Sequence, residues 1–163
     1  MAHAPSPVSA QVGVANVELS ARALSTLPRI DYADRFSLST RAEAGPERWA
    51  RAMFGDVPTP AERFIWSGLL GLRLHRGHAP ETVAGWRVAG HGQDWILLRA
   101  VSWMLTGNLL VQRGHEEVSL TTMIGYDRGM ARLVWPPLSA VHRRLSPGLL
   151  LHARQVVGGA VPR

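Results

Sequence analysis

The chain has 163 residues, of which 46% are hydrophobic and 18% charged, and its formal net charge at pH 7 is +6. This length supports one domain with a core of its own, and the composition is that of an ordinary globular protein. Cysteine is absent, which excludes disulfides, zinc–thiolate sites, iron–sulfur clusters and catalysis by a thiol.

All 18 basic residues are arginines, and apart from Arg143-Arg144 they are scattered along the chain. Because they form no basic run, we expect no nucleic-acid partner despite the positive charge. The N-terminus lacks the basic start and apolar core of a signal peptide, and no apolar run is long enough for a membrane span. We therefore expect a cytoplasmic protein.

The composition divides the chain into three segments. Residues 1–28 are predicted to be an N-terminal tail, partly disordered because residues 1–13 consist largely of Pro, Ser and Ala. Residues 29–157 form the single predicted domain, and residues 158–163 form a C-terminal tail.

The domain is predicted to begin with an edge strand over residues 30–40, where apolar side chains alternate with polar ones. Two short helices follow. The first opens at Gly45-Pro46, with the proline in its first turn, and the second starts near Thr59, which can cap it together with Glu62.

Four strands are predicted next, over residues 86–89, 95–103, 104–113 and 117–126. In the last of these, alternate side chains point to opposite faces. Because the connections between these segments are short, neighbouring strands should be antiparallel.

Residues 126–157 have apolar positions at steps of three or four, which indicates a helix with one apolar face. Three prolines interrupt this stretch. We predict that the main helix begins at Pro136-Pro137, that residues 128–135 form a separate turn, and that Pro147 adds a bend. The fold class is therefore α+β, with a C-terminal helix lying across a curved antiparallel sheet.

This order of elements resembles the helix-grip fold of the START/SRPBCC superfamily, which includes steroid and hormone binders, lipid-transfer domains and aromatic polyketide cyclases. Several motifs are also similar to those of an uncharacterised bacterial family of helix-grip type, for which no activity is established. These motifs are Leu27-Pro28, residues 31–36, residues 118–122, residues 131–135, residues 141–144 and Pro147. The resemblance implies a curved sheet wrapped on a long C-terminal helix, with two short helices after the first strand.

The space between such a sheet and helix is a candidate ligand cavity, and six tryptophans are available to line it. Those on strands could pack against a flat or polycyclic ligand, or they could simply be core and rim residues. The predicted ligand-binding residues are Trp86, Trp95, Trp103, Met104, Thr121, Met123 and Trp135.

Three residues are candidates for catalysis. Arg99 lies in an otherwise apolar strand, where a charge must be paired, solvated or turned toward a ligand. His142, beside two arginines, could act as a general acid or base, or could be a structural surface residue. Tyr126 could donate a hydrogen bond to a bound carbonyl, as could Thr121 or Thr122.

No metal or cofactor is predicted. His75 and His78 have a spacing that could supply two metal ligands, but no further ligands lie nearby, and a role at a helix end is the alternative. Phosphate-binding loops, dinucleotide fingerprints and the nucleophile elbow of hydrolases are also absent from the sequence.

We predict that the protein binds an apolar small molecule, cyclic or polyketide- or lipid-like, between the sheet and the C-terminal helix. The alternative is a cofactor-independent cyclase or isomerase of specialised metabolism that uses the same cavity and holds one conformer of its substrate. A third class, a structural or partner-binding domain, would have a filled core and an exposed apolar patch. A homodimer is compatible with each of these.

Overall fold

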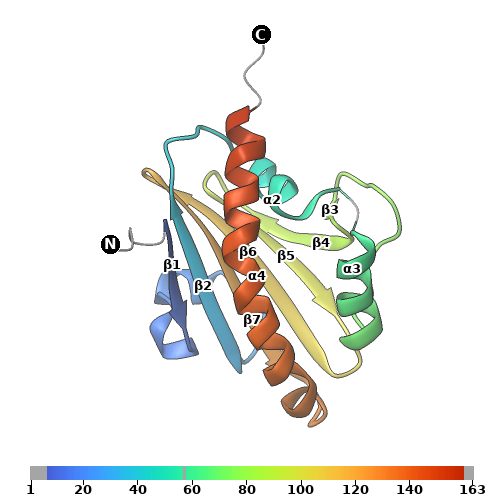
Figure 1. The fold of residues 1–163 in the computed structure, drawn as a ribbon. Helices are drawn as coiled ribbons and strands as arrows, with labels where there is room; N and C mark the ends of the chain where they lie inside the picture. Colours follow the sequence, from blue (N-terminus) through green and yellow to red (C-terminus); the bar gives the residue numbers. More distant parts are fainter. Residues whose placement is uncertain (1–6, 57, 160–163) are drawn as a thin grey trace, which may run out of the picture.

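The computed structural model describes residues 7–56 and 58–159. It is an α+β structure in which seven antiparallel strands form one curved, open sheet, and a long C-terminal helix lies across one face (Figure 1). The order of strands in the sheet is β1-β2-β7-β6-β5-β4-β3.

The strands are β1 (Val8–Val12), β2 (Tyr32–Ser39), β3 (Thr82–Val83), β4 (Trp86–His91), β5 (Trp95–Val101), β6 (Leu105–Gly114) and β7 (Glu117–Tyr126). The helices are η1 (Val14–Asn16), α1 (Leu19–Ala23), α2 (Pro46–Phe54), α3 (Pro60–Arg63), the π-helical turn η2 (Phe64–Leu69) and α4 (Ala131–Gly159). The predicted order of one strand, two short helices, an antiparallel meander and a final helix is confirmed.

The chain forms β1 and β2 at one edge of the sheet, crosses to the other edge, and then returns strand by strand. After β2, helices α2 and α3 carry the chain to the opposite edge, where β3 begins a meander that ends with β7 beside β2. Within the meander each strand pairs with the next in antiparallel register, as the short connections predicted. The long crossover leaves α2 and α3 on the same side of the sheet as α4 (Figure 1).

The N-terminal segment belongs to the sheet: within residues 1–28, predicted to be a partly disordered tail, the structure contains a strand and a helix. Strand β1 pairs with β2 from Val8↔Leu38 to Val12↔Asp34, so β2 is an interior strand and not the predicted edge strand. Helix α1 then packs on the face of the sheet opposite α4. The predicted tails at residues 1–6 and 160–163 lie outside the described residues.

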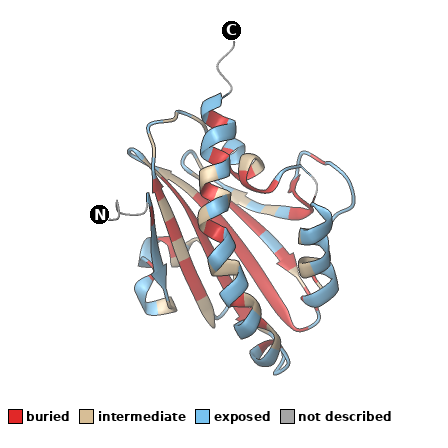
Figure 2. Ribbon diagram, in the orientation of Figure 1, coloured by how far each residue is buried: buried red, intermediate tan, exposed pale blue. Residues whose placement is uncertain are grey.

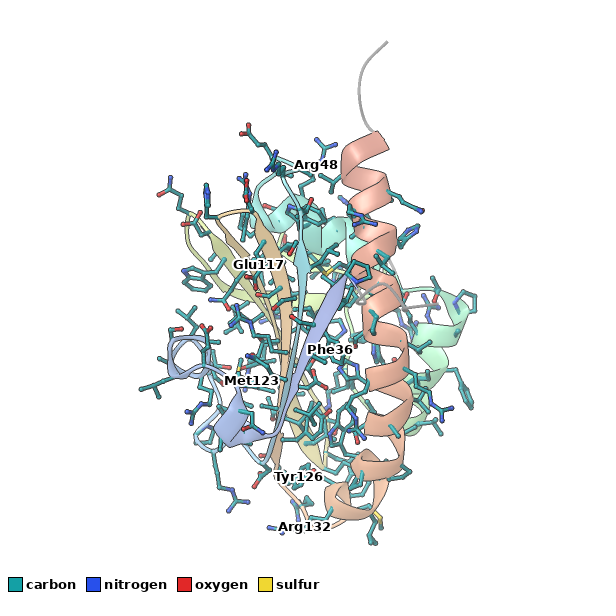
Figure 3. The ribbon with its side chains drawn as sticks, turned by 60° about the vertical axis from the view of Figure 1, so that its left-hand side comes forward. Phe36, Arg48, Glu117, Met123, Tyr126 and Arg132 are labelled. Atoms are coloured by element: carbon teal, nitrogen blue, oxygen red, sulfur yellow. The ribbon has the colours of Figure 1, made fainter. Side chains whose placement is uncertain are left out.

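Alternation of side chains gives the sheet two different faces. The concave face, toward α4, carries the main core, in which Phe36 is buried (Figures 2 and 3). The convex face carries a smaller cluster around Met123, which points away from α4 in Figure 3 and is covered by Val17 and Ala21. Because successive residues of a strand point to opposite faces, Tyr32, Asp34 and Phe36 all face α4.

Helix α4 is one continuous element of 29 residues, although it contains Pro136, Pro137 and Pro147. The predicted division into a separate turn and a later main helix is therefore wrong. Each proline removes one backbone hydrogen bond, and the carbonyls that lose this partner belong to Arg132, Leu133 and Arg143, which are exposed or half-buried residues. Among the described residues, no helix combines the length and apolar character needed to cross a membrane.

Asn108 joins the N-terminal segment to the convex face of the sheet through side-chain hydrogen bonds. It is fully buried on β6, and its Oδ1 accepts hydrogen bonds from Ser25 Oγ at 2.8 Å and Thr26 N at 2.9 Å. Its Nδ2 donates to Thr26 Oγ1 at 3.0 Å. One amide side chain thus supplies both the donor and the acceptor that this loop requires.

We expect Asn108→Ala to lower the free energy of unfolding by about 1–3 kcal/mol, because it leaves buried polar groups without partners. Urea denaturation of the purified protein measures this change. Arg99→Ala is the matched control: Arg99 is the cross-strand neighbour of Asn108 but is exposed, so its replacement should change stability by less than about 0.5 kcal/mol. Equal effects of the two substitutions would contradict the role given to Asn108.

Candidate functional site

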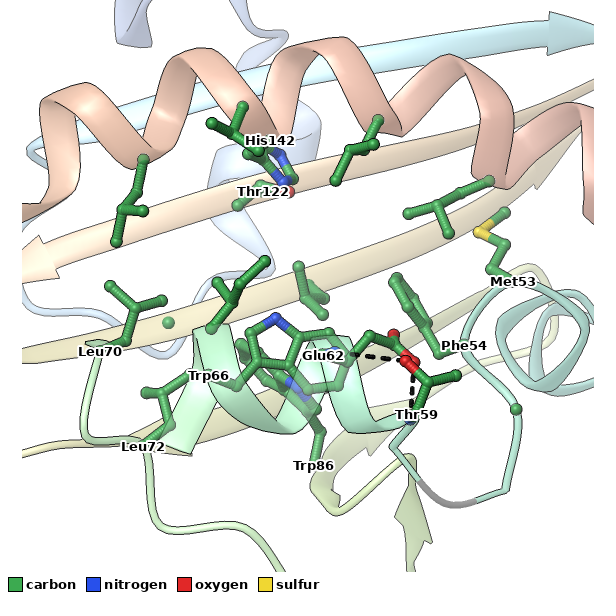
Figure 4. Close-up of a pocket in the computed structure, with 18 of the residues that line it drawn as sticks. Met53, Phe54, Thr59, Glu62, Trp66, Leu70, Leu72, Trp86, Thr122 and His142 are labelled. Atoms are coloured by element: carbon green, nitrogen blue, oxygen red, sulfur yellow. Dashed lines mark hydrogen bonds between the residues drawn. The ribbon is translucent and has the colours of Figure 1, made fainter. Parts of the chain in front are cut away.

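A cavity of about 600 Å³ lies between the concave face of the sheet, helix α4 and the segment from α2 to η2 (Figure 4). Most of the side chains that line it are apolar. On one side they include Phe54, Trp66 and Trp86, and on the α4 side they include Leu138, Leu145 and Leu149. The cavity thus occupies the space predicted from the order of the elements.

Three aromatic rings form one wall of the cavity. The rings of Trp66 and Trp86 meet edge to face with centroids 5.6 Å apart, and Phe54 contacts Trp66 in the same manner at 6.3 Å. Trp86 reaches across the sheet to β6, where Gly107 provides room. A Cβ atom at position 107 would lie 3.1 Å from the Trp86 ring, which is tighter than an ordinary contact.

Local sequence explains how Trp66 reaches this wall. Thr59 and Glu62 form a capping box in which each side chain accepts a hydrogen bond from the other residue's backbone N–H (Figure 4). This fixes the start of α3 as predicted. The helix then widens into the π-helical turn η2, which places Trp66 over the cavity.

On the opposite side of the cavity, His142 contacts a buried carboxylate that does not itself line the cavity. Asp34 on β2 has an exposed fraction of 0%, and its Oδ2 lies 3.2 Å from His142 Nε2 on α4. Tyr32 donates its hydroxyl hydrogen to the same carboxylate, and Arg143 in turn donates to the Tyr32 oxygen at 3.3 Å. A buried carboxylate is tolerated only with such partners.

Tyr32 remains protonated and is therefore a hydrogen-bond donor. Burial raises the pKa of Tyr32 well above its ordinary value, and the neighbouring Asp34 carboxylate raises this pKa further, while Arg143 lowers it by a smaller amount. The phenol therefore stays neutral at physiological pH and donates to Asp34.

Three buried polar atoms at the cavity have no hydrogen-bond partner among the described residues: Thr122 Oγ1, Trp86 Nε1 and Trp135 Nε1. Thr122 is the cross-strand neighbour of Asp34, and the Trp135 ring lies 5.8 Å from the His142 ring. An unpaired buried donor is costly, so each of these groups would gain from a hydrogen-bond partner.

The structure brings three of the predicted site residues to the cavity: Trp86, Trp135 and His142. Met104 is buried in the same core but does not line the cavity. Trp103 lies in the turn between β5 and β6 and is 56% exposed.

The remaining predicted residues lie elsewhere. Trp95, Thr121 and Met123 belong to the convex face, because the pleat turns them away from α4. Arg99 is also on that face and is exposed, so it is solvated and does not enter the cavity.

Tyr126, at the end of β7, is half-buried and lies outside the cavity lining. The Arg132 guanidinium lies 5.9 Å from the centre of its ring. Partial burial, with a smaller effect of the Asp31 charge, raises the pKa of Tyr126.

Sequence reasoning missed Asp34 and Tyr32, and it named Thr122 only as an alternative to Thr121. Their only signal was the alternation that places Tyr32, Asp34 and Phe36 on one face of a strand. In an edge strand this alternation is not informative, because a polar residue there can be solvated. The sequence predicts that β2 is an edge strand.

Among the residues the structure describes, no group of three or more His, Asp or Glu side chains is arranged to hold a metal ion. His75 and His78 are both exposed, and His78 Nε2 lies 3.6 Å from Asp56 Oδ1. Their contacts are those of a surface loop after η2.

No protein-family model matches the chain, and the comparisons with curated proteins and with solved structures found no match either. The resemblance to the START/SRPBCC superfamily therefore stays a prediction. We infer the function from the site itself.

The raised pKa of Tyr32 predicts how stability depends on alkaline pH. An unfolded tyrosine loses its proton near pH ~10, whereas folded Tyr32 keeps it to higher pH, so the native state binds more protons in that range. This contribution to stability is complete below about pH 10 and is lost as the pH rises toward the folded pKa. Urea denaturation between about pH 9 and 11 should show a falling free energy of unfolding.

Tyr32→Phe should make this alkaline decline shallower, because phenylalanine has no proton to lose. Tyr126→Phe is the matched control, since Tyr126 is less buried and should contribute less to the decline. If the free energy of unfolding of Tyr32→Phe falls with rising pH as steeply as that of the wild type, the Tyr32 phenol is not buried and hydrogen-bonded as in this structure.

Proposed function

We propose that this protein binds an apolar small molecule, cyclic or polyketide- or lipid-like, in the cavity between the sheet and α4. The observation that carries the proposal is the cavity itself, with a volume of about 600 Å³ and a mostly apolar lining. Pockets for small organic ligands have volumes in this range and are lined in this manner.

The aromatic wall favours a ligand with a flat or cyclic body. Trp66 and Trp86 present ring surfaces that are already fixed against each other, so they lose little side-chain freedom when a ligand packs on them. Apolar contact on this wall would supply most of the affinity.

The buried, unpaired donors favour a ligand with at least one oxygen. Thr122 Oγ1 and Trp135 Nε1 lie on the side of His142, and Trp86 Nε1 lies on the aromatic wall. A carbonyl or hydroxyl oxygen bound at one of these atoms would fix the orientation of the apolar body. Hydrocarbons without oxygen would leave these groups unsatisfied and should bind less tightly.

We further propose that the fold is of the helix-grip type of the START/SRPBCC superfamily, in a cytoplasmic bacterial protein. Support comes from the motifs shared with the uncharacterised bacterial family, and from a curved antiparallel sheet with a long C-terminal helix. In this comparison β1 is an addition that extends the sheet beyond β2.

Binding can be tested with N-phenylnaphthylamine, an uncharged polycyclic probe whose fluorescence rises in apolar surroundings. We expect saturable binding by the wild-type protein. Leu145, which lines the cavity and is 55% exposed, offers a place to introduce a charge without disturbing the core. Leu145→Glu should weaken binding about tenfold or more, because a carboxylate at the cavity must be desolvated.

Leu133→Glu is the matched control. Leu133 lies on the same helix and is 73% exposed, but it does not line the cavity, so this substitution should leave the dissociation constant unchanged. Absence of saturable binding, or an equal effect of the two substitutions, would contradict the proposed binding site.

A second candidate function is a cofactor-independent cyclase or isomerase that acts in the same cavity. The specific observation in its favour is the contact between His142 and the buried carboxylate of Asp34. Of the three predicted catalytic residues, His142 alone lines the cavity, whereas Arg99 and Tyr126 do not. A histidine oriented by a carboxylate is a common arrangement for proton transfer.

A native mass spectrum of protein purified from its own host would detect a retained ligand and identify it by mass. The extracted ligand can then be incubated with fresh wild-type protein and with His142→Ala. Conversion by the wild type alone would support the enzyme. Recovery of an unchanged ligand from both would support a binding protein.

A further inference from the structure

The contact between Asp34 and His142 is a built feature of the fold that binding of an apolar ligand does not require. Asp34 is separated from His142 by more than a hundred positions in the chain, yet β2 and α4 bring them within hydrogen-bonding distance. A carboxylate at this depth carries a large desolvation cost that an apolar residue would avoid. Its presence therefore suggests a role for charge at the cavity.

The contact also determines which nitrogen of His142 is available. Because Nε2 lies against the Asp34 carboxylate, the neutral imidazole carries its hydrogen on Nε2 and has its lone pair on Nδ1. No hydrogen bond to Nδ1 is made by residues 7–56 and 58–159. Nδ1 is thus the ring nitrogen without a partner among the described residues, on a side chain that lines the cavity.

The surroundings of Asp34 stabilise its negative charge. Tyr32 donates to the carboxylate, and Arg143 contacts the Tyr32 oxygen and also donates to Ser139 Oγ at 2.9 Å. An imidazolium formed at His142 would therefore face a carboxyl group that is held in place by its own hydrogen bonds. This is the arrangement by which a carboxylate orients a histidine and stabilises its protonated form.

Hydrogen-bond donors without partners lie on both sides of this histidine. Thr122 is the cross-strand neighbour of Asp34, and the Trp135 ring lies beside the His142 ring. In Figure 4, His142 and Thr122 enter from α4 and β7, on the side of the cavity opposite Trp66 and Trp86. A polar group held near His142 can thus be bound at its oxygen while the body of the ligand packs on the aromatic wall.

From these observations we infer that His142 is a general base toward a carbon acid, namely an apolar cyclic ketone with a C–H bond next to its carbonyl. Asp34 is its positioning residue. This inference rests on the proposed binding function and specifies the substrate class of the same cavity.

The reaction needs no further reactant. His142 Nδ1 takes the proton from the carbon next to the carbonyl, the electrons of the C–H bond form a carbon–carbon double bond, and the carbonyl π electrons move to oxygen. Thr122 Oγ or Trp135 Nε1 donates a hydrogen bond to that oxyanion. The imidazolium exchanges its hydrogen with solvent before a proton returns to carbon. Return to the same carbon then gives isotope exchange, and return to a conjugated carbon gives isomerisation.

The test uses β-tetralone, a bicyclic ketone with acidic C–H bonds, in deuterium oxide. Binding is measured by displacement of N-phenylnaphthylamine, and deuterium uptake is followed by mass spectrometry after subtraction of the rate in buffer. We expect wild-type protein to bind the ketone and to accelerate deuterium uptake. His142→Gln should lower the rate at saturation about 100-fold or more, because a general base contributes roughly that factor.

The dissociation constant for β-tetralone should change less than about threefold in His142→Gln, since the lost interaction belongs to the transition state. His115→Gln, at an exposed position in the β6–β7 turn, is the control and should retain the wild-type rate. Asp34→Asn should lower the rate at saturation about tenfold or more while binding persists, because an amide cannot stabilise the imidazolium. If Asp34→Asn does not fold, as judged by circular dichroism, His142→Gln carries the test.

The possible outcomes separate the two proposals. Binding of the ketone with equal deuterium uptake in wild type and His142→Gln would overturn the general base and leave the binding function intact. His152 on α4 also lines the cavity. Loss of uptake in His152→Gln, and not in His142→Gln, would overturn the assignment to His142. Failure of the wild-type protein to bind either the fluorescent probe or the ketone would overturn the binding function, and the general base with it.

Discussion

The burial of one carboxylate under a long helix is the constraint on which this structure depends. Asp34 faces α4 from an interior strand, with no exposed surface, and it must find its partners within the protein. Tyr32 comes from the same strand and His142 from the helix, so satisfying the charge also fixes where α4 lies along the sheet. The polar contact thereby selects one position of α4 on the sheet. An interface made of apolar contacts alone would allow many positions of nearly equal energy.

This constraint divides the cavity into two chemically different ends. Apolar aromatic rings, held in place by the capping box and by the space over Gly107, form one end. His142 and Thr122 form the other, with Asp34 behind His142. Because the two ends come from different parts of the chain, the fold positions them independently, and a ligand must satisfy both to fill the cavity.

Much of the architecture could be predicted from periodicity, because alternation and the three-to-four spacing report directly on which face of an element is buried. Strand β1, which the sequence analysis does not predict, shows where periodicity fails. Val8–Val12 is short and rich in small and polar residues, so its pairing with β2 depends on backbone hydrogen bonds that leave no mark in the sequence. Without β1, β2 would be an edge strand, and Asp34 would be expected to be solvated. Arg99 was misplaced for the converse reason, since an apolar neighbourhood in sequence spans both faces of the sheet.

The three prolines of α4 have a consequence for how a ligand enters. A helix that bends away from a sheet ordinarily stretches its own backbone hydrogen bonds, and this resists the movement. At Pro136, Pro137 and Pro147 those bonds are absent from the start. Bending α4 at these points therefore breaks fewer backbone hydrogen bonds than bending it elsewhere. The prolines thus lower the cost of moving the helix away from the sheet, and contacts with an apolar ligand would offset the apolar contacts that such a movement loses.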